Sequence, residues 1–201
     1  MTREYVDGAK RRDQIARAAL SVLTRDGGAG LTIRRVAAKL GVAPSAIYRH
    51  FPDKGAIVDA VLTLVGEMIQ DNVDRALEEE DHPLDALGLL LMRHTHFLVS
   101  DLGAGHIFLT TEILAHYPDK NQRIATNVEQ LAERVSGILL RAAKQGIVRS
   151  DIPAHVLARM YVGLFQPPVL HYQLLGGLTH LVGVVEENWS AFRTMVQPQI
   201  K

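Results

Sequence analysis

Apolar side chains recur along this chain at the spacing of an α-helix, and this pattern constrains its fold more than any other feature. Two clear series are Ile15, Ala18, Ala19, Val22, Leu23 and Ile124, Val128, Leu131, Val135, Ile138, Leu139. Each series places its members on one face of a helix. No segment shows the apolar–polar alternation of a convincing β-strand, so the sequence predicts an all-α fold.

Glycine, proline and capping residues divide this helical material into about nine segments. The first four are expected from about residue 9 to 25, from the cap Thr32 to residue 40, from Pro44 to about residue 51, and from the cap Asp53 to about residue 79. The run Gly27-Gly28-Ala29-Gly30 ends the first segment and Gly41 ends the second. The chain therefore begins with a group of helices of which the second and third are short.

Five further helices are expected after residue 80. The fifth begins at Pro83, Gly103 to Gly105 separate it from the sixth, and Pro118-Asp119 separate the sixth from a seventh that ends near Gly146. The eighth begins at Asp151 and Pro153 and ends at Gly176-Gly177, and the ninth begins at Thr179.

Pro167 and Pro168 lie inside the eighth expected helix. Neither has the N–H that would continue the hydrogen-bond ladder, so they predict a kink that leaves the carbonyls of Gly163 and Leu164 unpaired. Such a kink either opens a cavity beside a neighbouring aromatic ring or is a plain packing adjustment.

The composition excludes several kinds of protein. The 201 residues contain no cysteine, which rules out disulfides, thiolate metal ligands and cysteine nucleophiles. The first twelve residues lack the apolar run of a signal peptide, and no stretch reaches the roughly 18 apolar residues that a membrane span needs. The sequence therefore predicts a cytoplasmic protein without a membrane segment, and it predicts no cofactor.

The net charge of zero conceals two oppositely charged parts. Residues 1–60 contain 11 Lys and Arg against 6 Asp and Glu, whereas residues 61–201 contain 11 against 16. The balance is thus +5 in the first part and −5 in the second. A basic N-terminal part indicates a polyanionic partner there and a different role for the remainder.

Residues 31–54 have the pattern of a helix-turn-helix motif, because two short helices flank a glycine turn. The apolar positions that must face each other are Val36, Ala37, Leu40, Val42 and Ile47. The polar positions left outside are Thr32, Arg34, Arg35, Ser45, Tyr48, Arg49, His50 and Lys54. Nearly all of these side chains can donate hydrogen bonds to phosphates or base edges, so the motif favours binding to DNA.

The motif resembles the N-terminal DNA-binding domain of the tetracycline-repressor (TetR) family of transcriptional regulators. The residues that carry the resemblance are Leu31-Thr32, Arg34, Val36-Ala37, Leu40-Gly41-Val42, Ile47-Tyr48, His50-Phe51 and Lys54, within a match over roughly residues 9–62. The ending Tyr-x-His-Phe-x-x-Lys makes it specific. The resemblance implies a DNA-binding domain over residues 1–53 and an effector-binding and dimerisation domain over residues 54–201.

The resemblance also implies a role for each DNA-contacting residue. The helix from Pro44 to His50 would enter the major groove, and the expected contacts are Thr32, Arg34, Arg35, Pro44, Ser45, Ala46, Tyr48, Arg49, His50 and Lys54. Tyr48, His50 and Lys54 would bind phosphates, and Arg34 would read guanine. Two alternatives remain open: Tyr48 is a half-buried packing residue, or His50 caps the C-terminus of the recognition helix.

For the second domain the resemblance implies a homodimer and a small, hydrophobic effector. The last helix carries the stripe Leu178, Leu181, Val182, Val185, Trp189, Phe192 and Val196, which either pairs with a second copy, together with the preceding helix, or packs inside its own chain. Effector contacts are expected between the fifth and eighth helices at Met92, His96, Phe108, Glu112, His116, Tyr161 and Phe165, with Phe97 and Met160 in the same apolar space.

Other functions find less support in the residues. His94 and His96 point away from each other on a helix, so no metal site is predicted. No phosphate loop or Gly-x-Ser-x-Gly elbow is present, so we do not expect an enzyme. A helical protein that packages DNA without an effector is a further alternative. The sequence favours a homodimeric, ligand-responsive repressor that binds a palindromic operator.

Overall fold

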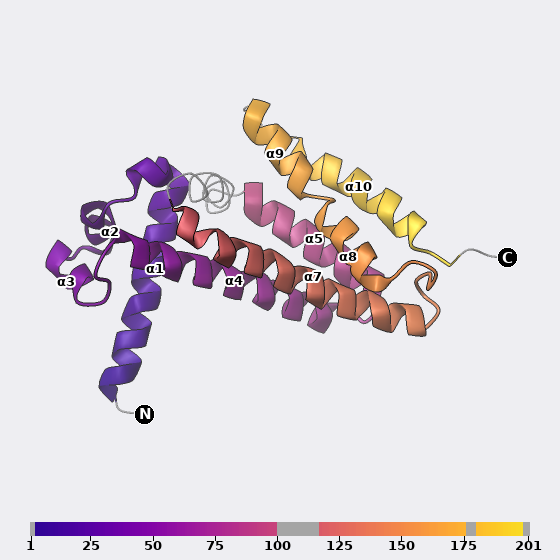
Figure 1. The fold of residues 1–201 in the computed structure, drawn as a ribbon, viewed down its shortest axis with the longest axis horizontal. Coiled ribbons are helices and arrows are strands. Elements are labelled where there is room, and N and C mark those ends of the chain that lie inside the picture. The colour runs from indigo at the N-terminus through magenta and orange to yellow at the C-terminus, as the bar shows by residue number, and fades with distance from the viewer. Residues whose placement is uncertain (1–2, 100–116, 176–179, 199–201) are drawn as a thin grey trace. The chain divides into compact units, whose positions relative to one another are not determined.

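The computed structural model describes residues 3–99, 117–175 and 180–198, and every regular element in these ranges is helical (Figure 1). The all-α prediction is therefore confirmed. The chain divides into two compact units, of which the first consists of residues 1–68 and 100–125 and the second of residues 69–99 and 126–201. The domain boundary proposed after residue 53 concerns functional roles and stays a prediction.

The first unit contains the short N-terminal helices. It is built from α1 (Arg3–Gly30), α2 (Ile33–Leu40), α3 (Pro44–Tyr48), the first part of α4 (Lys54–Glu79), the 3-10 helix η1 (Pro118–Lys120) and the start of α7 (Asn121–Lys144). Its core consists of fully buried apolar side chains, namely Ile15, Ala19, Val22, Val36, Ile47, Phe51, Ile57, Val58 and Val61. The amphipathic pattern read from the sequence is thus the pattern of this core.

Local capping signals fix the ends of these short helices as expected. The Thr32 hydroxyl accepts a hydrogen bond from the backbone N–H of Arg35, and the Asp53 carboxylate accepts one from Ala56 at 2.8 Å. Gly41 ends α2 in the left-handed conformation, with φ 65°, and Pro44 opens α3. At Gly27 the backbone of α1 leaves helical geometry (φ 68°, ψ −178°), so the expected end of the first helix is realised as a kink.

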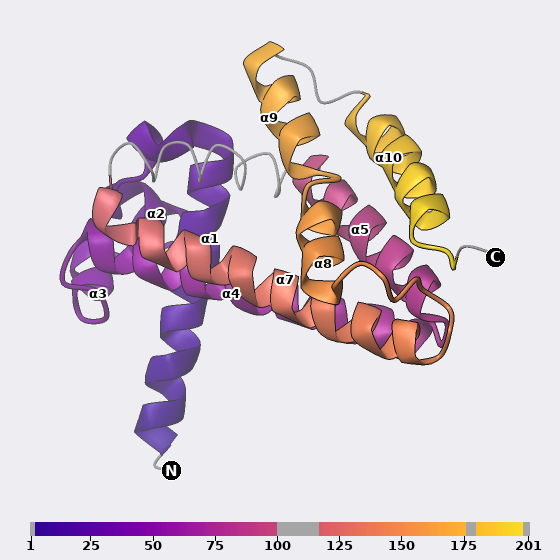
Figure 2. The same ribbon diagram turned by 45° about the vertical axis from the view of Figure 1, so that its right-hand side comes forward.

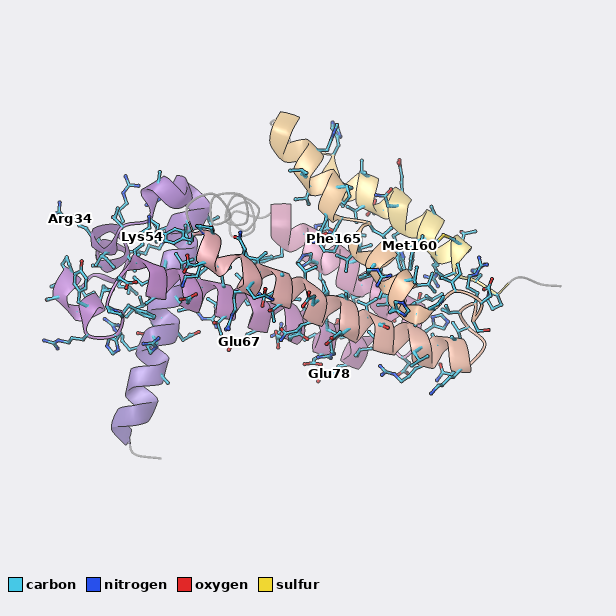
Figure 3. All side chains as sticks on the ribbon, viewed as in Figure 1. Arg34, Lys54, Glu67, Glu78, Met160 and Phe165 are labelled. Atoms are coloured by element: carbon cyan, nitrogen blue, oxygen red, sulfur yellow. The ribbon has the colours of Figure 1, made fainter. Side chains whose placement is uncertain are left out.

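One ion pair joins η1 to α4 inside the first unit, and a second lies within η1. The Lys120 ammonium lies 2.7 Å from the Asp59 carboxylate and 2.9 Å from that of Asp119. Hydrogen bonds to these two carboxylates raise the pKa of Lys120, so it stays charged. Farther along α4, exposed acidic residues recur at helical spacing: Glu67, Asp71, Asp74 and Glu78. Figure 3 labels Glu67 and Glu78, while Asp71 pairs with Arg75 and Asp74 pairs with Arg134 of α7.

The second unit packs the remaining helices around one apolar core. It contains the rest of α4 and α7, together with α5 (Pro83–Val99), α8 (Ala154–Val162), α9 (Gln166–Leu175) and α10 (Leu181–Met195) (Figure 2). The largest fully buried side chains here are Leu87, Leu91, Leu139, Leu157, Tyr161 and Leu181. No helix in the described part of the chain has both the length and the hydropathy of a membrane span.

The prediction of a single eighth helix kinked at its prolines is wrong. The helix breaks earlier, at residues 163–165, and Pro167 and Pro168 occupy the first turn of α9. In a first turn the missing proline N–H groups cost nothing, because those donors have no helical partner in any case. The Leu164 carbonyl, expected to be unpaired, accepts a hydrogen bond from the Asn188 side-chain amide at 3.0 Å.

The apolar stripe of the last helix is covered by the chain itself. Leu181, Val185, Phe192 and Val196 are buried, and α10 packs against α5 within the second unit. The interpretation of this stripe as the surface that pairs with a second copy is therefore wrong. Two further expectations for this helix, a start at Thr179 and a place for Leu178 in the stripe, lie outside the described residues.

Trp189 reaches the backbone of α5 because Gly88 has no side chain. A Cβ atom built on Gly88 would lie 2.9 Å from the indole Nε1 of Trp189 and 3.0 Å from its Cε2. The same indole stacks on the ring of Phe192, with a centroid distance of 5.9 Å. The close packing of α5 and α10 thus depends on a glycine at position 88.

We expect Gly88→Ala to lower the free energy of unfolding by about 1–3 kcal/mol, because the added methyl group forces the Trp189 ring out of its place. Urea unfolding followed by Trp189 fluorescence measures the change. Gly137→Ala in α7 is the matched control, because its added Cβ would meet only the Arg141 guanidinium, at an ordinary contact distance of 3.7 Å. The control should be neutral or stabilising by up to about 1 kcal/mol. Equal stability of the two variants would contradict this account.

Candidate nucleic-acid interface

The two helices of the helix-turn-helix motif are held together by buried apolar residues on their facing sides. Val36, Ala37 and Ile47 are buried, and the backbone N–H of Gly41 donates to the carbonyls of Ala37 and Ala38 to close the turn. The small side chain of Ala37 permits the close approach of α2 and α3. The outer side of α2 and α3 therefore presents residues that are not buried in the core.

Four predicted contact residues on this outer side are exposed and have side chains free of internal bonds. The side chains of Arg34, Ser45, Tyr48 and Arg49 make no hydrogen bond or ion pair with another residue in the described ranges. Tyr48 is 56% exposed, so its ring is not a packing residue of the core. Arg34 points away from the helices, as Figure 3 shows. These side chains offer two guanidinium groups and two hydroxyls to a partner.

Arg35 has a different environment from its neighbour Arg34. Its guanidinium lies 3.2 Å from the carboxylate of Asp26, which also pairs with Arg25 at 3.0 Å. The hydrogen bond from Arg25 and the two nearby positive charges lower the pKa of Asp26. Arg35 thus stabilises the end of α1 in addition to any contact with a ligand.

Lys54 at the start of α4 is also engaged internally. Its ammonium donates a hydrogen bond to the Gly28 carbonyl at 3.1 Å and lies 5.6 Å from the centroid of the Tyr117 ring. Figure 3 shows Lys54 among the helices of the first unit. A lysine ammonium has three donors, so a phosphate contact remains compatible with this arrangement.

Arg12, which the sequence did not indicate as a functional residue, bonds the chain at the C-terminal end of α3. Arg12 on α1 donates from its Nη1 to the carbonyl oxygen of His50 at 2.5 Å, and its guanidinium lies 4.3 Å from the centroid of the Phe51 ring. His50 itself is half-buried. The signal in the sequence is that Arg12 shares the helical face of Ile15 and Ala19, where an apolar residue would be expected.

The expected effector contacts that the structure describes lie in the second unit. Met92 is half-buried, His96 is exposed, and Tyr161 and Phe165 are buried. Phe108, Glu112 and His116 lie outside the described residues. Met160, expected in the same apolar space, is instead exposed on α8 (Figure 3).

Tyr161 and Phe165 have established internal partners. The Tyr161 hydroxyl donates to the Leu87 carbonyl at 2.7 Å, and burial raises the pKa of this hydroxyl. The Phe165 ring meets the His94 ring edge-on, with centroids 4.7 Å apart. In the described ranges no group of three or more His, Asp or Glu side chains is placed to hold a metal ion.

Comparison with known proteins identifies the N-terminal helices. Residues 15–61, which include α2, α3 and most of the first unit's buried core, match the model of the bacterial regulatory proteins of the tetR family. Residues 15–61 therefore carry a TetR-family DNA-binding domain, and the relatives and folds that are similar over almost the whole chain support a TetR-family regulator. The predicted relationship, made from the Tyr-x-His-Phe-x-x-Lys ending and the helix-turn-helix pattern, is confirmed.

Proteins similar to this chain include nucleoid occlusion factors. It is 30% identical to the nucleoid occlusion factor SlmA of Aliivibrio fischeri strain ES114 over 126 residues, which span 62% of this chain and 62% of that protein. It is 24% identical to SlmA of Vibrio atlanticus over 203 residues, which cover 96% of this chain and 97% of the relative.

Solved structures show the same fold over almost the whole chain. A TetR transcription regulator from Haloarcula marismortui superposes with a TM-score of 0.80 at 18% identity, covering 94% of this chain and 98% of the other. A putative TetR-family regulator from Mesorhizobium loti gives a TM-score of 0.78 at 17% identity, covering 98% and 100%. At these identities the likeness concerns the fold.

The residues predicted for DNA contact thus fall into two groups. Arg34, Ser45, Tyr48 and Arg49 are exposed and have side chains free of internal bonds, and exposed Pro44 and half-buried Ala46 lie beside them. Thr32, Arg35, His50 and Lys54 each take part in an internal hydrogen bond or ion pair, and His50 does so through its carbonyl oxygen.

Proposed function

We propose that this chain is a homodimeric transcriptional repressor that binds a palindromic operator and is released by a small, hydrophobic effector. The observation that carries the DNA-binding part is the set of exposed, unbonded donors on the outer side of the helix-turn-helix. They lie in a part of the chain whose net charge is +5, so phosphates are attracted to the same surface.

In this proposal α3 enters the major groove and the flanking residues bind the backbone. Arg34 reads guanine through its two-pronged guanidinium, and Arg49 and Ser45 supply the remaining contacts to base edges. Tyr48, His50 and Lys54 bind phosphates. Because residues 43–46 offer a single hydroxyl, sequence preference depends mainly on the two arginines.

Two substitutions separate base reading from phosphate binding. Arg34→Ala should cost about 1–3 kcal/mol on the preferred duplex and relax the preference at one base pair, whereas Lys54→Ala should weaken all sequences similarly. Lys54→Ala should also reduce the slope of log affinity against log salt by about one. Selection of bound duplexes from a random pool, followed by salt titration, measures both effects. An unchanged salt slope would assign Lys54 to its internal bond with Gly28 alone.

Dimerisation through the last two helices is proposed on the exposed sides of α9 and α10. Leu170 on α9 is 52% exposed although it is a large apolar residue, and Pro167 is exposed beside it. On α10 the side opposite the buried stripe carries small residues such as Gly183 and Ser190. Two recognition helices held about one DNA turn apart read a palindrome, so the dimer is required for specific binding.

Leu170→Glu is expected to convert the dimer to a monomer and to weaken operator binding, because it places a charge in the proposed interface. Sedimentation at several protein concentrations measures the oligomeric state. Leu140→Glu is the matched control, because Leu140 is equally apolar and 50% exposed but lies on α7. A wild type that stays monomeric at every concentration would refute the proposed dimer.

Effector binding is proposed at Met92, His96, Phe108, Glu112, His116, Tyr161 and Phe165. The Tyr161 hydroxyl donates a hydrogen bond to the Leu87 carbonyl, but its oxygen retains lone pairs that can accept a hydrogen bond from a ligand. The helix α4 is continuous from Lys54 to Glu79 and contributes residues to both units. A tilt of α4 on effector binding would lower operator affinity, by no more than the effector's preference for one state.

A thermal-shift screen against hydrophobic ligands should reveal a compound that stabilises the folded chain by mass action. For that compound, Tyr161→Phe and Glu112→Gln should each raise the concentration needed for half-release of the operator by about tenfold, through one lost hydrogen bond. Operator-release titrations measure this shift. Wild-type responses in both variants would exclude the proposed effector contacts.

Nucleoid occlusion is the second candidate function, because it is named for relatives that are similar over 96% of this chain. A factor that acts over the whole nucleoid needs binding sites spread along the chromosome, whereas a repressor needs sites near a few promoters. A map of the fragments bound in cells therefore distinguishes the two functions.

A further inference from the structure

Arg12 connects α1 to the C-terminal end of the recognition helix through two contacts. Its Nη1 donates to the carbonyl oxygen of His50 at 2.5 Å, across 38 positions of the sequence. Its guanidinium carbon lies 4.3 Å from the centroid of the Phe51 ring, and that ring is fully buried. The Arg12 side chain thus bonds the backbone of His50, just after α3, and also packs on the buried ring of the next residue, Phe51.

The end of α3 needs such a partner because the helix is very short. Both the His50 and the Phe51 N–H groups donate to the Ile47 carbonyl, at 2.9 and 3.0 Å. The carbonyls beyond Ile47 therefore have no helical donor of their own. A guanidinium supplies a charge-assisted donor in a planar group that also stacks on an aromatic ring, and lysine lacks this second property.

Neighbouring arginines on α1 bond locally and do not share this arrangement. Arg11 donates to the Gln14 side chain at 2.9 Å, and Arg17 pairs with Asp13 at 2.9 Å, so both stay within α1. Arg11 and Arg12 carry the same charge at adjacent positions. They therefore form a matched pair that separates the effect of charge from the effect of the contact with α3.

We propose that Arg12 is a positioning residue for base recognition, which fixes the orientation of α3 on α1 and hence the placement of Tyr48 and Arg49. This inference rests on the proposed DNA-binding function. Hydrogen bonds to base edges weaken steeply when angles and distances change, whereas attraction to phosphates depends little on orientation. Loss of Arg12 therefore reduces the discrimination between sequences more than it reduces affinity for DNA in general.

The test compares Arg12→Ala, Arg12→Lys and Arg11→Ala in the full-length protein. Each variant is titrated with the duplex that the wild type selects from a random pool and with a shuffled duplex of the same composition. We expect Arg12→Ala to lower the ratio of the two affinities by about tenfold, the discrimination of roughly one base contact, with an unchanged salt slope. Arg11→Ala should keep the wild-type ratio, and Arg12→Lys should fall between Arg12→Ala and the wild type.

Three results would overturn the inference. If Arg12→Ala reduces the slope of log affinity against log salt by about one and leaves the ratio of the two affinities unchanged, Arg12 is a phosphate contact. Equal losses on both duplexes that follow the folded fraction would make its role purely structural. If Arg12→Ala does not fold, an Arg12→Lys variant with the wild-type ratio of affinities for the selected and shuffled duplexes would also overturn the inference. A wild type that binds no duplex would refute the proposed function itself, which distinguishes that failure from the other three.

Discussion

The short helix α3 has no independent stability, and the rest of the proposed DNA-binding face depends on how it is held. α3 is five residues long, far below the length at which an isolated helix forms in water. Its position is set by burial of Ile47 and Phe51, each 0% exposed, against the core of the first unit. Because these two side chains point inward, Ser45, Tyr48 and Arg49 on the other side of the short segment point outward.

Features that depend on local chemistry were predictable from the sequence. Thr32, Gly41, Pro44 and Asp53 end or begin helices where expected, because a cap is decided by a few adjacent residues. The proline pair at residues 167–168 was misread for a related reason. Proline is unfavourable inside a helix but suited to its first turn, and the sequence does not show which applies until the break at residues 163–165 is known.

Features that depend on distant partners were not predictable in the same way. The amphipathic stripe of α10 shows that one face is covered, but not whether α5 or a second copy covers it. The same limit applies to the candidate DNA contacts: Arg34 and Arg35 look equivalent in sequence, and only the fold brings Asp26 to one of them. Arg12 escaped notice because its partners are 38 and 39 positions away.

The exposed acidic residues on one face of α4 have a kinetic consequence. Glu67, Asp71, Asp74 and Glu78 make this face of α4 less attractive to a polyanion than the basic N-terminal residues, although Asp71 pairs with Arg75 and Asp74 pairs with Arg134. A duplex that approaches this face of α4 meets weaker attraction than one that approaches the basic residues, and such a difference in local charge favours a faster search.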